Sequence, residues 1–119
     1  MMPYKRGDVV LVPFPFSDTE TTNKRPAVIV QSNSFNRKLD TVIVAQITSN
    51  ISRANKEPSQ LLVKIGTPEG RLTGLLHDSA VKCETLATIS KNKLLRTIGK
   101  LTGPLPEMLD ASLRKTLGV

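Results

Sequence analysis

Several polar side chains stand where apolar, β-branched runs of the sequence begin or end: Arg25, Thr48, Ser49, and the neighbours Asp78 and Ser79. Side chains at strand ends are held by rigid backbone and still reach solvent, which a site that handles phosphate groups requires. Arginine suits phosphate because its guanidinium is planar, bidentate and always charged. These residues therefore suggest phosphate chemistry.

Cleavage of RNA without a metal ion needs three chemical groups. A base must take the proton of the 2′-hydroxyl, a cation or hydrogen-bond donors must meet the charge that grows on the phosphate oxygens, and an acid must protonate the departing 5′-oxygen. Arg25 suits the second role, but it is a poor base because the pKa of arginine exceeds about 12. A carboxylate or a histidine would suit the base better, and the residues leave that role unassigned.

Each of these residues also has an ordinary structural interpretation. An arginine beside a proline is typical of a solvated strand edge or an ion pair, and Thr48 fits a β-former at a strand end. The single histidine, His77, stands in a loop, which favours a surface or structural role over a catalytic one. Cys83 lies within an apolar strand pattern and is expected to be an inert core residue. Residue types alone leave the site undecided.

The elements that must position these residues are short strands. Apolar, β-branched runs separated by Gly, Pro, Asn, Asp and Ser indicate strands, and the gaps are too short for crossover helices. The sequence therefore predicts a mainly β fold, a small barrel or roll, in which the nearly all-apolar Val42–Ile47 is central and covered on both faces. The expected strands are Asp8–Phe14, Pro26–Gln31, Thr41–Thr48, Leu61–Ile65 and Ser79–Cys83.

Helical patterns come mainly late in the chain. Ser90 as an N-cap and Gly99 as the residue after the last turn predict two turns of helix between them. The apolar face would consist of Leu94, Leu95 and Ile98, and the basic face of Lys93, Arg96 and Lys100. Such a basic face is typical of a solvated helix, with nucleic-acid contact as the alternative. Ser32–Lys38 predicts one further turn. Pro106 as the first helical residue, followed by Leu109, Leu113 and Leu117, predicts an amphipathic C-terminal helix.

Two polar loops, 13–25 and 66–79, flank the predicted strand ends. The first is too long for a tight hairpin, and long loops commonly serve as lids or binding elements. Its aromatic residues Phe14 and Phe16 fit either of two roles, stacking on bases or anchoring the loop in the core.

Length and composition limit the number of domains and the classes of partner. The chain has 119 residues, which predicts one domain over 1–119, and 17 Lys and Arg against 10 Asp and Glu give a net charge of +7. An evenly basic domain attracts RNA or DNA, and a ribosomal subunit or an acidic protein also fits. One cysteine and one histidine form neither an internal disulfide nor a zinc site of nitrogen and sulfur ligands, so we expect no metal and no cofactor. No apolar run approaches the ~20 residues that a bilayer needs, so we expect a cytoplasmic protein without membrane contact.

The order of short motifs distinguishes among these possibilities. They are Arg6-Gly7-Asp8-Val9-Val10, Lys24-Arg25-Pro26-Ala27-Val28-Ile29-Val30, Ala45-Gln46-Ile47-Thr48-Ser49 and Asp78-Ser79-Ala80-Val81, followed by Glu84, Thr88 and Ile98-Gly99-Lys100-Leu101. In this order and spacing the chain resembles the PemK/MazF family of toxin endoribonucleases from bacterial toxin–antitoxin systems. The resemblance covers nearly the whole length.

The resemblance implies a homodimer of SH3-like β-barrels with short helices and a C-terminal helix. It implies metal-independent cleavage of single-stranded RNA at short sequences, leaving a 2′,3′-cyclic phosphate and a 5′-hydroxyl, and a cognate antitoxin that covers this surface. The family's catalytic arginine and threonine match Arg25 and Thr48. The residues expected beside RNA are Phe16, Ser17, Asp18, Lys24, Ser49, Arg53, Lys56, Asp78 and Ser79.

The chain also departs from the family pattern. Many members have Glu-Gln-x-Arg-Thr where this chain has Glu84-Thr85-Leu86-Ala87-Thr88, and its first loop has no glycine, so the RNA recognition sequence does not carry over. The alternatives from another functional class are a gyrase-poisoning toxin of the related CcdB fold, an inactive relative, and a general RNA-binding barrel. The motifs around Arg25 and Thr48 favour the nuclease, because a gyrase binder has no need of a phosphate-facing arginine and hydroxyl.

Overall fold

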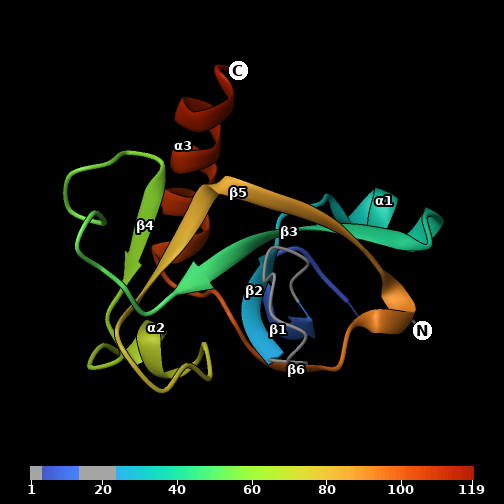
Figure 1. Ribbon diagram of the computed structural model, residues 1–119, viewed down its shortest axis with the longest axis horizontal. Helices are drawn as coiled ribbons and strands as arrows, with labels where there is room; N and C mark the ends of the chain where they lie inside the picture. Colours follow the sequence, from blue (N-terminus) through green and yellow to red (C-terminus); the bar gives the residue numbers. More distant parts are fainter. Residues whose placement is uncertain (1–3, 14–23) are drawn as a thin grey trace.

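The structure is a computed structural model that describes residues 4–13 and 24–119 (Figure 1). The strands are β1 (Asp8–Pro13), β2 (Lys24–Ile29), β3 (Thr41–Thr48), β4 (Gln60–Val63), β5 (Ser79–Ser90) and β6 (Arg96–Lys100). Short helices follow β2, β4 and β5, and a longer helix follows the last strand. The helices are α1 (Asn33–Lys38), α2 (Pro68–Arg71), the single 3-10 turn η1 (Lys91–Lys93) and α3 (Leu105–Leu117).

The six strands form one antiparallel sheet in the order β4-β5-β3-β2-β1-β6. The predicted central place of β3 is confirmed. Within β5 the register against β3 shifts sharply, because Ala45 pairs with Leu86 whereas Gln46 pairs with Lys82. Extra residues on one strand of a pair bend that strand. Figure 1 shows β5 bending so that the sheet curls, which confirms the predicted barrel-like β fold with short helices and a C-terminal helix.

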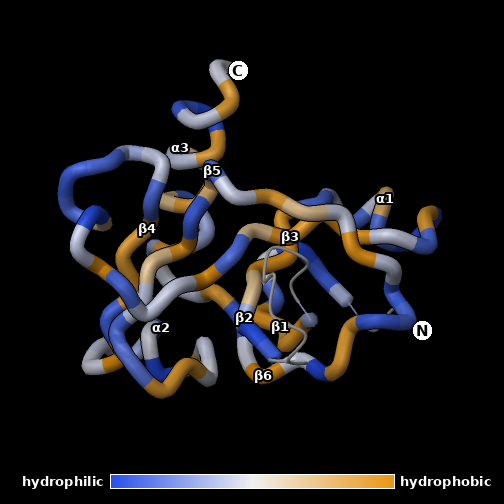
Figure 2. Tube along the Cα trace, viewed as in Figure 1, coloured by the Kyte–Doolittle hydropathy of each residue, from blue (hydrophilic) through white to orange (hydrophobic). Residues whose placement is uncertain are grey.

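The curled sheet buries apolar residues on both faces, because successive side chains of a strand point to opposite sides. Val44 belongs to a cluster on one face with Leu94, and Ala45 belongs to the cluster on the other face that Leu109 of α3 covers. Figure 2 shows hydrophobic chain concentrated along these strands and hydrophilic chain in the loop that joins β3 to β4. The prediction that Val42–Ile47 is covered throughout is wrong at Ile43, which is 37% exposed.

Two of the three predicted helices are confirmed. The turn over Ser32–Lys38 is α1, and the amphipathic C-terminal helix is α3, which begins one residue before Pro106. Leu109 of α3 is fully buried, whereas Leu117 at its end is 56% exposed. Within the described residues, no helix has the length and apolar character that would let it cross a membrane.

The predicted helix between Ser90 and Gly99 is wrong. β5 extends beyond its predicted end to Ser90, and the chain then makes one 3-10 turn and continues as β6, an edge strand paired with β1. The apolar spacing misleads here because Leu94 and Ile98 pack into clusters on opposite faces of the sheet, which one helix face cannot do. Tertiary pairing therefore overrides the local helical pattern.

Candidate active site

One end of the sheet gathers the ends of four strands. Because neighbouring strands are antiparallel, β2, β5 and β6 begin where β3 ends. Register fixes the neighbours there, since Thr48 pairs with Ala80 and Arg96 pairs with Leu11. Residues far apart in the sequence are thereby placed around one opening.

A cavity of about 520 Å³ lies at this end of the sheet. Its walls come from the strand ends just described and from the loop after α2, and it combines apolar, cationic and hydroxyl side chains. It is lined by Leu11, Lys24, Arg25, Pro26, Ile47, Thr48, Ser49, Gly74, Leu75, Leu76, His77, Ser79, Arg96 and Ile98. The cavity therefore unites both predicted catalytic residues with Lys24, Ser49 and Ser79 of the predicted RNA-binding set.

Arg25 and Thr48 occupy equivalent places on adjacent strands. The last residues that pair β2 with β3 are Ala27 and Gln46, and Arg25 and Thr48 each lie two residues further toward the same end of the sheet. The side chain of Arg25 is exposed, and the hydroxyl Oγ1 of Thr48 accepts a hydrogen bond from the backbone N–H of Asn50 at 3.1 Å. That bond fixes the hydroxyl while leaving its own proton available as a donor.

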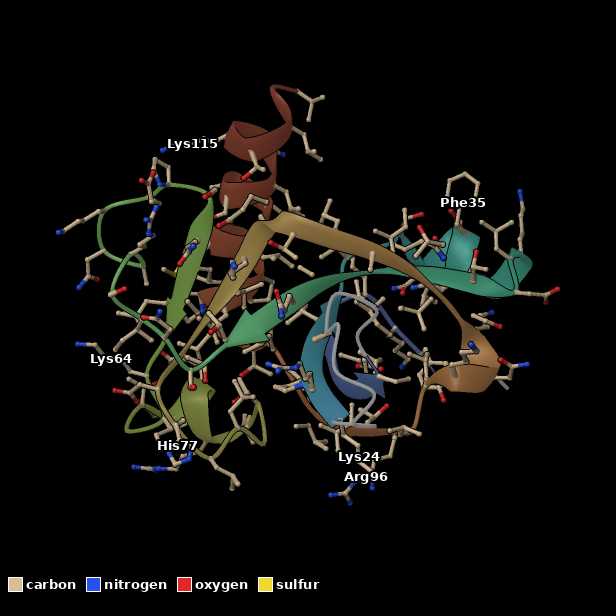
Figure 3. All side chains as sticks on the ribbon, in the orientation of Figure 1. Lys24, Phe35, Lys64, His77, Arg96 and Lys115 are labelled. Atoms are coloured by element: carbon tan, nitrogen blue, oxygen red, sulfur yellow. The ribbon has the colours of Figure 1, made fainter. Side chains whose placement is uncertain are left out.

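The cavity is electropositive. Lys24, Arg25 and Arg96 line it, and no carboxylate is found among the described residues that do so. Figure 3 shows Lys24, Arg96 and His77 along the same lower edge of the molecule. A concave site with cations of one sign concentrates anions, so this cavity suits a phosphate-bearing chain.

Other predicted RNA-binding residues do not line the cavity. Asp78 turns its Oδ1 atom back onto the backbone N–H of Ile65 at 2.9 Å, which indicates a structural role. Arg53 and Lys56 are exposed in the connection between β3 and β4 and remain predicted contacts. Phe16, Ser17 and Asp18, together with Phe14, lie outside the described residues.

Two ionisable residues that line the cavity, Arg96 and His77, were not in the predicted site. Arg96 was expected on a helix face with Lys93 and Lys100, and the strand β6 instead places it at the cavity. His77 was expected to have a surface or structural role, and it is an exposed residue that also lines the cavity. The sequence feature that could have indicated a site role for His77 is the position of its loop next to predicted strand ends.

The loop that carries His77 is fixed against β6. The carbonyl of Leu72 accepts a hydrogen bond from the N–H of Lys100 at 2.9 Å. Gly74 has a φ of +76°, and a Cβ there would lie 2.1 Å from the carbonyl oxygen of Ile98. Only glycine permits both the left-handed backbone and this close approach. The wall of the cavity is therefore set by contacts between segments distant in the sequence.

The departures from the family pattern fall near the register shift in β5, away from the cavity. Ala87 packs against the apolar cluster inside the curl. Beside them, Gln60 Nε2 donates to Glu84 Oε2 at 2.8 Å. Burial raises the pKa of the Glu84 carboxyl, but hydrogen bonds from Gln60, the backbone and Ser59 outweigh it, so the pKa lies below its ordinary value.

A second cavity, of about 550 Å³, lies between α3 and β4. It contains none of the predicted site residues. Within the described part of the chain, no three His, Cys, Asp or Glu side chains gather in the manner of a metal site. The cavity at the strand ends is therefore the candidate site.

Comparison with known proteins gives consistent results. The sequence profile of the PemK-like, MazF-like toxins of type II toxin–antitoxin systems matches residues 5–117. Endoribonuclease MazF2 of Mycobacterium bovis is 32% identical over 104 residues, which are 87% of this chain and 86% of that protein.

Solved structures share the fold. An endoribonuclease in complex with its cognate antitoxin, from a mycobacterial species, superposes with a TM-score of 0.78 at 20% identity, covering 98% of this chain and 96% of that chain. MazF from Deinococcus radiodurans gives a TM-score of 0.68 at 17% identity, covering 98% of this chain and 97% of that chain. At such identities the likeness concerns the fold alone.

Proposed function

The chain belongs to the PemK-like, MazF-like family of toxins of type II toxin–antitoxin systems, and from this premise we propose that it is a sequence-selective endoribonuclease. Its substrate is single-stranded RNA in the cytoplasm. It cuts without a metal ion and leaves a 2′,3′-cyclic phosphate and a 5′-hydroxyl. A cognate antitoxin neutralises it.

The cavity at the strand ends is the observation that carries this proposal. Arg25 and Thr48 both line this one concave site, together with Lys24 and Arg96, which supports the proposal. Apolar walls from Leu11, Pro26 and Ile47 (among others) offer surfaces for bases, and the cations meet the phosphates. A site with apolar surfaces for bases and cations for phosphates fits a ribonuclease better than it fits a gyrase-binding surface.

Arg25 and Thr48 have distinct roles in the proposed reaction. The RNA 2′-oxygen attacks the adjacent phosphorus, a new phosphorus–oxygen bond forms, and the bond to the 5′-oxygen breaks. Arg25 donates hydrogen bonds to the non-bridging oxygens as their charge grows, and its guanidinium gives a proton to the departing 5′-oxygen. Thr48 donates a hydrogen bond from its hydroxyl to the same phosphate and so fixes the position of the phosphate.

We further propose that the active form is a homodimer bound by an acidic antitoxin segment. Exposed apolar residues at the end of α3, Leu117 and Val119, offer surface for a second copy, and a dimer would let Arg53 and Lys56 extend the basic surface into a shared RNA groove. An acidic segment would compete with RNA for this groove, with affinity that falls as salt rises. Sedimentation at micromolar concentration tests the dimer, and a 13 kDa species that cleaves RNA would refute it.

Incubation with a mixed-sequence RNA in EDTA tests the central proposal. Discrete cuts with cyclic-phosphate and 5′-hydroxyl ends are expected. Intact RNA together with inhibited gyrase would instead support the gyrase-poisoning alternative, and intact RNA that is bound without being cut would support a general RNA-binding barrel. The folded Arg25→Ala protein is the control for a contaminating nuclease.

A further inference from the structure

We propose that His77 is the general base of the cleavage reaction, acting on the 2′-hydroxyl of the bound RNA. The inference rests on the proposed ribonuclease activity and adds the chemical group that Arg25 and Thr48 leave missing. It departs from the sequence-based expectation that His77 has a structural or surface role.

His77 is placed where a base is needed. It lines the same cavity as Arg25 and Thr48, as part of the wall formed by the loop after α2, and it is exposed to an incoming ligand. Figure 3 shows it on the same edge of the molecule as Lys24 and Arg96. A phosphate held by the cations would therefore present its neighbouring ribose to this wall.

The backbone around His77 is anchored on both sides. The Oγ of the buried Ser79 donates a hydrogen bond to the carbonyl oxygen of His77 at 2.8 Å. The Oδ1 of Asp78 accepts from the N–H of Ile65 at 2.9 Å. Together with the contacts of Gly74 and Leu72 against β6, these bonds hold the imidazole on fixed backbone, as catalytic geometry requires. They also give roles to two predicted RNA-binding residues, which position His77.

The chemistry of the cavity selects His77 among the described lining residues. Their other polar side chains are hydroxyls, which are weak bases, and the cations Lys24, Arg25 and Arg96, which carry their proton already. The imidazole is the side chain that most often serves as a general base, because it accepts a proton near neutral pH.

Each proton in the proposed step has a stated destination. The unprotonated nitrogen of the His77 imidazole takes the proton of the 2′-hydroxyl while the 2′-oxygen bonds to phosphorus. The 5′-oxygen leaves with the proton of Arg25. The imidazolium then returns its proton through solvent to the Arg25 guanidine, which restores the starting state.

Substitution of His77 gives the first test. We expect His77→Ala and His77→Gln to lower kcat by about 10²- to 10⁴-fold with little change in KM, because general base catalysis contributes that range. Arg71→Ala is the matched control, since Arg71 is an exposed residue at the end of α2, just before this loop, and does not line the cavity. Wild-type cleavage by a folded His77→Ala protein would overturn the inference and leave the ribonuclease proposal standing.

The pH profile gives a second test, because His77 is the single histidine of the chain. Its one imidazole can be titrated by NMR without assignment. We expect the acid limb of the kcat/KM profile to share its midpoint, and to disappear in His77→Gln. If the acid limb persists in His77→Gln, another group is the base and the inference is overturned.

A substrate with a sulfur in place of the bridging 5′-oxygen separates the base from the acid, because a thiolate leaves without a proton. The defect of His77→Ala should persist on this substrate, whereas that of Arg25→Ala should shrink. Rescue of His77→Ala to wild-type rate by the sulfur would make His77 the acid and overturn the inference. Failure of the wild-type protein to cut either substrate would instead refute the ribonuclease proposal itself.

Discussion

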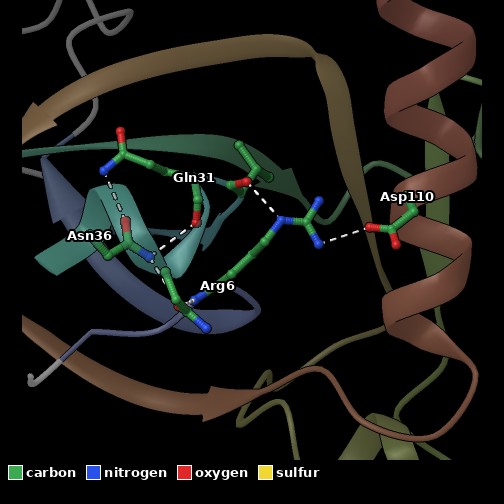
Figure 4. Close-up of polar contacts among 6 residues, drawn as sticks. Arg6, Gln31, Asn36 and Asp110 are labelled. Carbon is green, nitrogen blue, oxygen red and sulfur yellow. Dashed lines mark hydrogen bonds and ion pairs between the residues drawn. The ribbon is translucent and has the colours of Figure 1, made fainter. Parts of the chain in front are cut away.

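β2 connects two polar regions that use arginine in opposite ways. Arg25, at the start of β2, lines the cavity and is exposed. Beyond the other end of β2, Arg6 donates from its Nε to the carbonyl oxygen of Val30 at 2.9 Å and from Nη1 to Asp110 Oδ1 at 2.8 Å (Figure 4). The second arginine joins β2 to α3, and its hydrogen-bonding capacity is directed into the protein.

The polar cluster around Arg6 is internally satisfied. Asn36 is fully buried, accepts from Gln31 Nε2 at 2.9 Å and donates to the Gln31 carbonyl at 3.0 Å. Asn33 Oδ1 accepts from the N–H of Arg6 at 2.7 Å. Buried polar groups with all partners in place specify the fold, whereas polar groups at a cavity mouth remain available to a ligand. The contrast predicts that substitutions in the cavity reduce activity and substitutions in the cluster reduce stability.

Among the substitutions that test this contrast, Arg25→Ala should give the largest effect and confine it to activity. Removal of one donor aimed at developing charge costs about 10²- to 10³-fold in rate, and Arg25→Lys should restore little because bidentate geometry is lost. Single-turnover cleavage with thermal unfolding as the control measures both. An unchanged rate in the folded variant would remove Arg25 from the site.

Thr48 should show a smaller loss that depends on its hydroxyl. Thr48→Ala should slow cleavage by about 10- to 100-fold, the value of a hydrogen bond to a charged group, whereas Thr48→Ser should keep much of the rate. Equal rates for the two variants would show that the hydroxyl has no part in the reaction. Single-turnover cleavage measures both rates.

Alkaline pH should affect the stability of the fold through Cys83, which lies in the α3-covered core. Burial, and then the charge of Glu84, raise the pKa of Cys83 to about 11, while the Arg6 charge partly opposes them. Because the folded-state pKa exceeds the ordinary value of 9.0, this contribution is complete below pH 9 and is lost as pH rises through 11. We expect wild type to lose about 2 to 3 kcal/mol over that range relative to Cys83→Ala in urea unfolding. The same pH dependence of the free energy of unfolding in wild type and Cys83→Ala would contradict this expectation.

Asn36→Ala should have the smallest of these effects and confine it to stability. The variant leaves Gln31 without its buried partner, which costs about 2 kcal/mol in the free energy of unfolding. Urea unfolding measures the loss. Cleavage per folded molecule should match wild type, and a proportionate loss of kcat would show that the cluster and the cavity are coupled.

Local sequence patterns predicted most of the fold. β-branched runs predicted β1 to β4 near their observed bounds and the start of β5, and the spacing of Leu109, Leu113 and Leu117 predicted α3. The segment that forms η1 and β6 was predicted wrongly, because its spacing fits a helix and only its pairing with β1 makes part of it a strand. Such pairing joins residues that local patterns cannot relate.

The sequence by itself determined that Arg25 and Thr48 stand at strand ends and, through the order of its motifs, that they belong to one family pattern. The tertiary structure alone decided that Arg96 and His77 join them. Arg96 enters the cavity instead of Lys93 or Lys100 because of the β1–β6 register, and His77 enters because its loop docks on β6 through Gly74. Strand register and loop docking depend on contacts between distant segments, so the composition of the cavity was fixed only when the sheet curled.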